Sequence, residues 1–247
     1  MNSGRTRELQ GKVALVTGAG RNIGRAIALS LADAGASVVV NARNSKDEVQ
    51  TVCGGIEASG GQALALLADV TDEKAVERMI EATVKRFGRL DILVNNAALR
   101  AVEPVESIDL KRWREVTGVI LDGAWNCAHA ALDALKKSGA GAIVNIGGLS
   151  AHTGAAGRPH VVSAKEGLVG LTRALAHDLA PHNVTVNCVV PGMIETVRTS
   201  PSAHHREPPL GRRGKPEEVA AAVRFLAGPG ARYITGTVLH VSGGGAA

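Results

Sequence analysis

Residues 12–35 read KVALVTGAGRNIGRAIALSLADAG, and they join an apolar run, a glycine-rich turn and a helical pattern. The run Val13–Val16 is typical of a strand buried on both faces of a parallel sheet. Gly18 and Gly20 allow a tight turn, and apolar residues then recur along one face of a helix that ends at Gly35. The start of such a helix presents free N–H groups and a positive dipole end, so the stretch predicts a site for a pyrophosphate group.

Glycine spacing alone also fits a plain connection between a strand and a helix. The rest of the chain favours the binding turn, because short apolar runs alternate with helical patterns along its length. The further predicted strands are Val38–Val40, Ala63–Leu67, Ile92–Val94, Ala142–Ile146 and Val184–Val190. This alternation predicts an α/β fold, a doubly wound parallel sheet of Rossmann type in three layers, with ligands bound at the carboxyl ends of the strands.

Length and charge favour one domain that binds small molecules. The 247 residues, 45% of them hydrophobic, can bury a large core, and we expect residues 1–247 to form a single domain. The formal net charge is +5, and the basic clusters Arg5-Thr6-Arg7 and Arg212-Arg213-Gly214-Lys215 have no aromatic residues interleaved. These clusters are typical of solvated surface, so we expect no nucleic-acid partner.

The sequence also bears on compartment and metal binding. It has no apolar stretch long enough to cross a membrane and no signal-peptide core at its N-terminus. Three widely spaced cysteines indicate free thiols in a reducing compartment, which predicts a cytoplasmic protein: Cys53, Cys127 and Cys188. His204 and His205 are adjacent in a polar segment without a third ligand, so we expect a loop there and no metal site.

Ordered motifs along the chain resemble those of the short-chain dehydrogenase/reductase family, from about residue 11 to residue 245. They are Thr17-Gly18-Ala19-Gly20-Arg21-Asn22-Ile23-Gly24, Asp69-Val70-Thr71-Asp72, Leu93-Val94-Asn95-Asn96-Ala97, Val186-Asn187-Cys188-Val189-Val190-Pro191-Gly192 and Ile234-Thr235-Gly236. Three further segments are most like the 3-oxoacyl-carrier-protein reductases: Pro209-Leu210-Gly211-Arg212, Lys215-Pro216-Glu217-Glu218-Val219 and Val241-Ser242-Gly243-Gly244-Gly245. Asn22 and Ala98 replace two familiar glycines, and asparagine tolerates unusual backbone angles.

The resemblance implies a nicotinamide dinucleotide cofactor. The second strand ends without a carboxylate near Ala42 for a ribose 2′-hydroxyl, whereas Arg21 and Arg43 can flank a 2′-phosphate, so NADP(H) is favoured over NAD(H). Arg21 alone also fits a surface charge. The predicted cofactor-binding residues are Gly18, Gly20, Arg21, Asn22, Ile23, Gly24, Arg43, Asp69, Val70, Asn95, Ala97, Lys165, Pro191, Gly192, Ile194 and Thr196.

The resemblance fails at the positions that carry the chemistry. The family's tetrad implies an asparagine, a serine, a tyrosine and a lysine, and only the lysine is matched, by Lys165. Ile120, Gly148 and Val161 occupy the other three positions. General acid catalysis contributes about 10²–10⁴-fold, so the loss of the phenol should impair ordinary ketone reduction. The only tyrosine, Tyr233, lies too far along the chain and is expected to pack near the start of a strand.

His160 is the candidate replacement for the missing acid, because imidazole donates a proton near neutral pH. Geometry argues against direct substitution, since His160 and Lys165 point roughly 140° apart on a regular helix. A partly exposed histidine at the helix start, after Pro159, is the competing interpretation. Peroxisomal-type 2,4-dienoyl-CoA reductases of the family also lack the tyrosine and have a histidine here, so its absence does not prove inactivity. Ser150 and His152 should line the same mouth of the pocket.

Two classes of function remain open. The first is an NADP(H)-dependent oxidoreductase with an atypical site, acting on a carbonyl or an activated C=C bond of a small molecule. The second is a catalytically silent NADP(H)-binding protein that acts through association. The persistence of Lys165 favours the first class. The resemblance further implies a substrate lid around residues 193–214 and a homotetramer or homodimer, built through helices at about 108–136 and 160–180 and the C-terminal strand.

Overall fold

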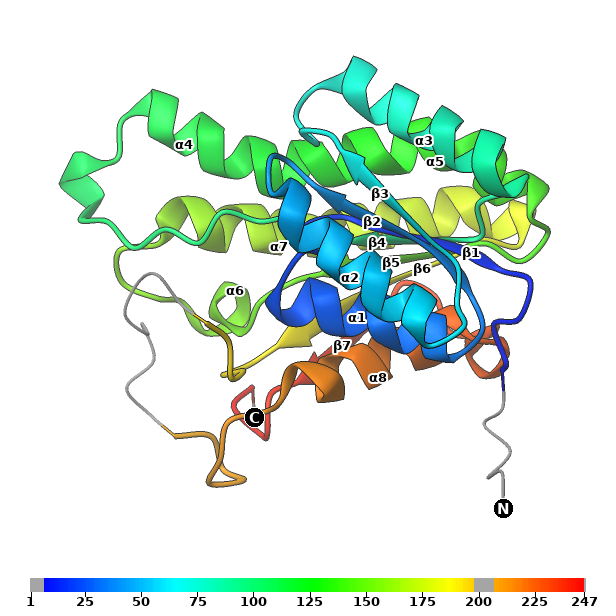
Figure 1. The fold of residues 1–247 in the computed structure, drawn as a ribbon. Helices are drawn as coiled ribbons and strands as arrows, with labels where there is room; N and C mark the ends of the chain where they lie inside the picture. The colour runs from blue at the N-terminus through cyan, green and yellow to red at the C-terminus, as the bar shows by residue number, and fades with distance from the viewer. Residues whose placement is uncertain (1–6, 198–206, 247) are drawn as a thin grey trace.

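A single parallel sheet organises the chain. The computed structural model describes residues 7–197 and 207–246. Their seven strands are hydrogen-bonded in the order β3-β2-β1-β4-β5-β6-β7, all parallel (Figure 1). The strands are β1 (Val13–Val16), β2 (Ser37–Ala42), β3 (Ala63–Leu67), β4 (Ile92–Asn95), β5 (Ala142–Ile146), β6 (Thr185–Pro191) and β7 (Val238–Val241). The predicted doubly wound α/β sheet is confirmed, and its order reverses between β1 and β4, where such folds bind ligands.

The six strands predicted from apolar runs are confirmed to within two residues at each end. They could be predicted because central parallel strands are buried on both faces, and β1, β4, β5 and β6 are buried at every position. β7 differs, because His240 is exposed and its other three residues are only half-buried. It forms one edge of the sheet, and the apolar pattern did not predict it.

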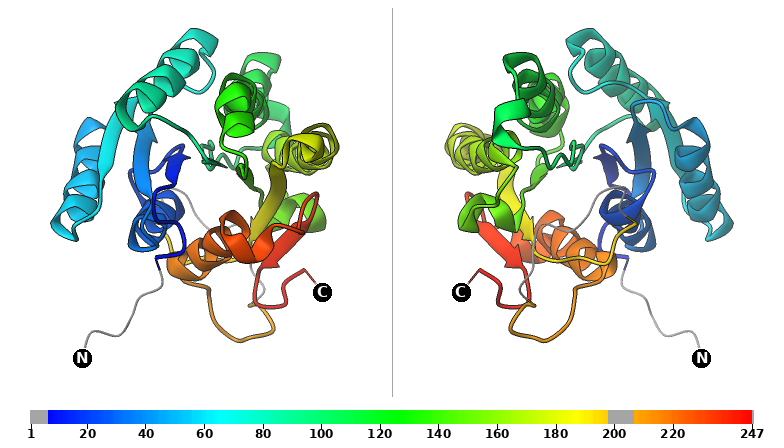
Figure 2. Two further views of the ribbon diagram at one scale, coloured as in Figure 1. Left: turned by 90° about the vertical axis from the view of Figure 1, so that its right-hand side faces the viewer. Right: turned by 90° about the vertical axis from the view of Figure 1, so that its left-hand side faces the viewer.

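Helices cover both faces of the sheet (Figure 2). One layer packs on the core with α1 (Asn22–Asp33), α2 (Lys46–Ala58) and α8 (Pro216–Ala227). The other contains α3 (Glu73–Phe87), α5 (Gly123–Lys137) and α7 (Pro159–Leu179). The shorter helices are α4 (Leu110–Thr117), α6 (Leu149–Thr153) and the 3-10 turns Val105–Ser107, Ala180–His182 and Pro229–Ala231. Within residues 7–197 and 207–246, no helix has the length and apolar character needed to cross a membrane.

The long helix expected over 108–136 is interrupted. α4 ends at Thr117, a π-helical turn follows at Gly118–Asp122, and α5 begins at Gly123. The interruption lies against α7, because α4 and the π turn both pack on that helix. A π turn widens the helix by one residue and is frequent at functional sites. Here it carries the buried side chain of Ile120.

The three cysteines are buried and unpaired with each other, which confirms the prediction of free thiols. Burial raises the pKa of Cys53 and Cys188 to about 11 and that of Cys127 to about 12. Thiolates are the reactive form of cysteine, so these side chains act as small apolar residues near neutral pH.

Candidate cofactor and substrate site

A cavity of about 590 Å³ opens at the carboxyl ends of the strands. Its walls come from the ends of β1, β2, β4 and β5, the start of α1, and the turn that precedes α7. The lining residues include Gly18, Gly20, Arg21, Asn22, Ile23, Gly24, Arg43, Asp69, Val70, Ala97, Lys165, Pro191 and Gly192 from the predicted cofactor set. Asn95, Ile194 and Thr196 from that set do not line it.

The glycine turn is shaped by close backbone approach. Gly18 has a φ of 60°, which favours glycine. A Cβ atom on Gly24 would lie only 2.4 Å from the Gly18 carbonyl oxygen, so that position admits no side chain. Asn22 has a φ of 51°, and asparagine is one of the residues that tolerate this region. The first turn of α1 carries no acidic residue, although the Glu48 carboxylate of α2 lies beside Gly20 in the turn that precedes it.

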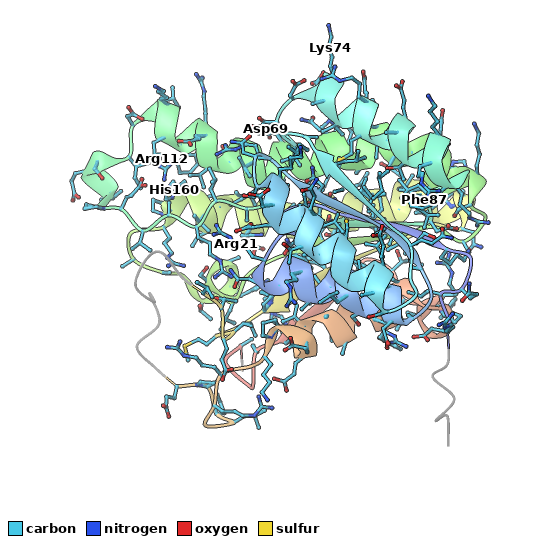
Figure 3. All side chains as sticks on the ribbon, viewed as in Figure 1. Arg21, Asp69, Lys74, Phe87, Arg112 and His160 are labelled. Carbon is cyan, nitrogen blue, oxygen red and sulfur yellow. The ribbon has the colours of Figure 1, made fainter. Side chains whose placement is uncertain are left out.

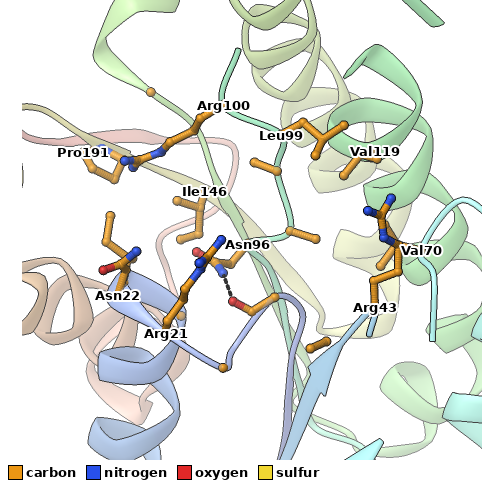
Figure 4. A pocket seen from close by; sticks show the side chains of 18 of the residues that line it. Arg21, Asn22, Arg43, Val70, Asn96, Leu99, Arg100, Val119, Ile146 and Pro191 are labelled. Atoms are coloured by element: carbon orange, nitrogen blue, oxygen red, sulfur yellow. Dashed lines mark hydrogen bonds between the residues drawn. The ribbon is translucent and has the colours of Figure 1, made fainter. Parts of the chain in front are cut away.

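Asn96 fixes this turn to the end of β4. Its Nδ2 donates to the carbonyl oxygens of Thr17 and Gly18 at 2.8 and 2.9 Å (Figure 4). In return, Thr17 Oγ1 accepts the backbone N–H groups of Asn96 and Ala97, both at 3.0 Å. Sequence reasoning had assigned the neighbouring Asn95 to the cofactor. The alternation of side chains along a strand sends neighbours to opposite sides, which is the signal that separates the two asparagines.

Asn95 instead supports the sheet from inside. Its Nδ2 donates to Asn145 Oδ1 on β5 at 2.9 Å, and Asn145 Nδ2 donates to Thr172 Oγ1 on α7 at 2.9 Å. All three side chains are buried. The network links β4, β5 and α7 beneath the pocket, so Asn95 supports the site without lining it.

Charged side chains gather where the pocket meets the end of β2 and the turn before α1. We call this part the adenosine end, after the dinucleotide that the sequence leads us to expect. Arg21 extends from the turn before α1 and Arg43 from the end of β2 (Figure 4). Arg43 Nη1 lies 3.9 Å from Asp69 Oδ2, and the Asp69 carboxylate also accepts the N–H and hydroxyl of Thr71 at 3.0 and 2.8 Å. Glu48, which sequence reasoning missed, also lines the pocket beside Gly20. Two guanidinium groups and two carboxylates therefore surround this end.

Lys165 lies at the opposite end, in the wall formed by α7 and β5. Its side chain is buried, and Nζ donates to the carbonyl oxygen of Ile146 at the end of β5. Burial lowers the pKa of Lys165 to about 8, with Cys188 acting in the opposite direction and Arg100 in the same direction. The ammonium form therefore predominates below about pH 8.

Apolar groups occupy the positions where the family carries its asparagine and tyrosine. Ile120 and Val161 are buried and belong to one apolar cluster together with Ala101, Val116 and Ala164. Val161 still lines the pocket, whereas Ile120 does not. Gly148 also lines it, and a Cβ atom there would find only Lys165 Cγ, at 3.9 Å. The apolar side chain of Val161 and the buried amine of Lys165 therefore lie in the same wall of the pocket.

His160 lies away from the pocket, although it adjoins Val161 in sequence. Its side chain is completely buried, and Nε2 points to Glu103 Oε2 at 3.6 Å. Glu103 in turn accepts from Arg112 Nε at 2.9 Å and Nη2 at 2.7 Å, and Arg112 and His160 lie near each other beside α4 in Figure 3. Arg112, and to a lesser extent His160, lowers the pKa of Glu103. His160 does not line this pocket, and its complete burial shows that the expected partly exposed histidine at the helix start is wrong. Its role in proton transfer stays a prediction.

The remaining polar candidates divide between the pocket and the surface. Ser150 is buried and lines the pocket as expected, whereas His152 does not line it and instead stacks edge-on against His240, with ring centroids 4.8 Å apart. Tyr233 is fully exposed, so its expected packing role is wrong. Within the part of the chain that the structure describes, no three His, Cys, Asp or Glu side chains gather as a metal site.

The loop after β6 reaches back over the pocket. Gly192 passes so close to the C-terminal segment that a Cβ atom on it would lie 2.7 Å from Ser242 Cα. Ile194 is buried, and Thr196 Oγ1 accepts a hydrogen bond from Arg100 at 3.3 Å. The Asn22 side chain makes two hydrogen bonds with the backbone of Val197, at 3.0 and 3.2 Å. Residues 198–206 of the expected lid, with His204 and His205, lie outside the described residues.

Comparison of the sequence with known proteins shows the family to which the chain belongs. Residues 18–245 match the family described as enoyl-(acyl carrier protein) reductase. A 3-oxoacyl-[acyl-carrier-protein] reductase of Synechocystis is 40% identical over 242 residues, which cover 96% of this chain and 97% of that protein. The corresponding reductase of Vibrio cholerae is 39% identical, with 96% and 98% covered.

Solved structures agree with the sequence matches. A short-chain dehydrogenase from Burkholderia cenocepacia, in complex with NADP, has a TM-score of 0.90 and 38% identity and covers 97% of this chain and all of its own. A dehydrogenase/reductase from Sinorhizobium meliloti has a TM-score of 0.93 and 36% identity, with 98% of each chain covered. The chain therefore belongs to the short-chain dehydrogenase/reductase family of oxidoreductases. Within that family it is most similar to the 3-oxoacyl-carrier-protein reductases.

Proposed function

We propose that this chain is an NADP(H)-dependent oxidoreductase with an atypical site, which reduces a carbonyl group or an activated C=C bond of a small molecule. The observation that carries the proposal is the continuity of the pocket from the glycine turn at Gly18 to the buried amine of Lys165. The first end offers an anion site at the start of α1, shaped by Gly18 and Gly24. Bound NADPH would supply the hydride, which forms the new C–H bond.

Lys165 is the residue proposed to position the cofactor at the reacting end. Its ammonium group has three donors, one of which is used by Ile146, so donors remain for the nicotinamide ribose hydroxyls. Val161 belongs to an apolar cluster, so this position has no side chain that can donate a proton to the substrate. The proton that balances the hydride then comes from solvent water, which suits substrates whose reduction needs little acid assistance.

The preference for NADP(H) is proposed from Arg21 and Arg43, which both line the pocket. The Burkholderia relative in complex with NADP supports the same cofactor. Replacement of Arg43 by Gln should weaken NADPH binding about tenfold and leave NADH binding nearly unchanged, because one charge-assisted contact contributes about 1.5–3 kcal/mol at most. Equal losses for both nucleotides, measured by fluorescence titration, would contradict a 2′-phosphate site.

A catalytically silent NADP(H)-binding protein is the second candidate. It is favoured by the packing of Ile120 and Val161 into the apolar cluster, where reductases of the family need polar groups. Both candidates bind NADPH, so binding alone does not separate them.

Turnover separates the two candidates. We would measure NADPH oxidation by the purified protein with ketones, quinones, 3-oxoacyl thioesters and enoyl thioesters, and use Lys165→Ala as the control. The oxidoreductase proposal expects turnover with at least one class and its loss in Lys165→Ala. Absence of turnover across the panel, with NADPH still bound, would favour the silent protein.

A homotetramer or homodimer is proposed as the assembled form. Apolar side chains remain exposed on the surfaces that the family resemblance assigns to assembly, with Leu110 on α4 61% exposed and Trp125 on α5 46% exposed. β7 also presents a free edge of the sheet. Light scattering after size-exclusion chromatography gives the mass directly, and a monomer of 25.4 kDa would contradict the proposal.

A further inference from the structure

We propose that the end of the pocket beside Lys165 binds an anionic group, a carboxylate or a phosphate, that the substrate itself carries, and that Arg100 and Arg158 are its ligands. Both arginines line the pocket. The inference rests on the proposed function in that the substrate enters beside the cofactor, and it names the substrate class that this site would take.

The two arginines come from segments that the fold holds together. Arg100 lies in the loop after β4, and Arg158 immediately precedes α7. The backbone N–H of Glu103 donates to the carbonyl oxygen of Gly157 at 2.9 Å, which joins the two segments. A Cβ atom on Gly157 would lie 3.0 Å from the Glu103 carbonyl oxygen, so the segments also pack in close contact. The two segments that carry Arg100 and Arg158 therefore adjoin each other at the rim of the pocket.

Buried packing keeps this rim in place. Ala101 follows Arg100 directly, and Val161 lies one helical turn after Arg158. Ala101 and Val161 belong to the same buried apolar cluster. Figure 4 shows Arg100 extending from its loop toward Pro191, on the opposite side of the pocket from Arg43. Arg43, which could serve a 2′-phosphate, and Arg100 thus lie on different sides of the cavity.

Charge is distributed unevenly along the cavity. The carboxylates among its lining residues, Glu48 and Asp69, lie at the adenosine end beside Gly20 and Arg43. Lys165, Arg100 and Arg158 also line the cavity, and Arg100 donates a hydrogen bond to Thr196 Oγ1 at 3.3 Å. Arg100 contributes to the lowered pKa of Lys165, so the two cations repel each other across this end. An anion bound between them would relieve that repulsion.

The wall between the cations indicates the rest of the ligand. Leu149 and Val161 line the pocket beside Lys165, and Gly148 adds no side chain. A planar guanidinium group binds carboxylates and phosphates through paired donors, whereas hydrocarbon walls bind an apolar chain. The surface therefore fits an organic anion with an apolar body and disfavours a neutral ester or a bare inorganic ion.

Binding to the full chain loaded with NADP⁺ tests the inference without turnover. Calorimetric titration would compare hexanoate, hexyl phosphate and methyl hexanoate, which share a hydrocarbon chain and differ in the charged group. At least one anion should bind ten-fold or more tightly than the ester, and the better anion identifies the headgroup. Arg100→Gln and Arg158→Gln should each remove most of this preference, while the matched surface variant Arg78→Gln on α3 should retain it.

Three results would overturn the proposal. The ester could bind as tightly as both anions, the two arginine variants could keep the preference, or they could weaken NADP⁺ binding and leave anion binding intact. Repeating the titration without nucleotide keeps the test valid if the cofactor binds weakly. The titration does not measure turnover, so the two proposals can fail separately. A protein that prefers the anion but fails to oxidise NADPH with any substrate of the panel would contradict the proposed function and still satisfy this inference.

Discussion

The two ends of the pocket are built on different principles. The adenosine end is defined by backbone shape, with Gly18 and Gly24 in close contact and Asn96 bonded to the turn. The reacting end is defined by single side chains, and Ile120 and Val161 now pack there as hydrocarbon. A nucleotide site of the first kind is tied to the fold, whereas proton transfer depends on a few atoms that can be replaced without disturbing the core. We therefore expect cofactor binding and chemistry to be separable in this chain.

The largest effect is expected from restoring the family's polar side chains at the reacting end of the pocket. The triple variant Ile120→Asn, Gly148→Ser and Val161→Tyr should raise reductase activity on 3-oxoacyl thioesters by about 10²–10⁴-fold, the usual contribution of a positioned acid. Gly148 has space for a side chain, and Val161 borders the cavity, so both replacements have room. The rate of NADPH oxidation measures the gain.

A matched control separates acid catalysis from packing. Replacing Val161 by Phe in the same background supplies the ring without the hydroxyl, and it should leave activity near the starting level. If a folded triple variant gains nothing over this control, the remaining scaffold is not competent for reduction. A circular dichroism spectrum and a thermal melt establish that each variant folds, since Ile120→Asn places a polar group among buried apolar side chains.

The second test addresses the cost of the buried amine. The pKa of Lys165 is about 8 against an ordinary value of 10.5, so between these pH values the unfolded chain holds a proton that the folded chain has released. Stability should therefore rise with pH through this window, by up to about 3 kcal/mol. Urea unfolding of the wild type and of Lys165→Met at several pH values measures the difference. The Met variant should lack this rise, and parallel pH curves would show that the amine is not buried as described.

Comparison with the variant is necessary because the cysteines act in the opposite direction. Burial raises the pKa of Cys53 and Cys127, so the folded chain keeps protons that the unfolded chain loses above about pH 8.5. Their contribution lowers stability as pH rises, and it is common to both proteins. The difference between wild type and Lys165→Met therefore reports the lysine together with its interaction with Cys188, whose pKa the Lys165 charge lowers.

The third test perturbs the adenosine end by one methyl group. A Cβ atom on Gly24 would lie 2.4 Å from the Gly18 carbonyl and 2.5 Å from Asn96 Nδ2, so Gly24→Ala must displace the turn. We expect it to destabilise the fold by about 1–3 kcal/mol and to weaken NADPH binding at least ten-fold. Gly54→Ala on α2 is the matched control, because no atom lies within 4 Å of its Cβ position. That change should stabilise the fold by about 0.5–1 kcal/mol, and similar effects at the two glycines would contradict the close-contact explanation.

The fold could be predicted from sequence because its information is local and repeated. Apolar runs such as Val13–Val16 and Ala142–Ile146 are buried at every position, and period and length identify them. β7 carries half-buried residues and gave no such signal. The π turn at Gly118–Asp122 also gave none, because a single turn is too short to establish a period of its own.

The site was harder to predict because contacts between distant segments decide it. The three absent catalytic groups could be read from sequence, since each has a fixed place in the family pattern. The direction of His160 could not be read, because it depends on Glu103, which lies far from it in the sequence and is itself held by Arg112. Arg100 and Arg158 were missed for the same reason, since only the folded chain brings their segments together.

The smallest effect is expected from a substitution of Asn22, whose side chain holds the loop after β6. Asn22 Nδ2 donates to the Val197 carbonyl oxygen at 3.2 Å, and Asn22 Oδ1 accepts the Val197 N–H at 3.0 Å. Because Asn22 has a φ of 51°, Asn22→Gly removes both bonds without backbone strain. Two partly exposed hydrogen bonds contribute on the order of 1 kcal/mol together, so hydrogen exchange at Val197 and release of NADPH in stopped-flow experiments should each accelerate several-fold. Asn22→Asp retains only the acceptor and should give an intermediate result, whereas unchanged exchange at Val197 in Asn22→Gly would show that this side chain does not hold the loop.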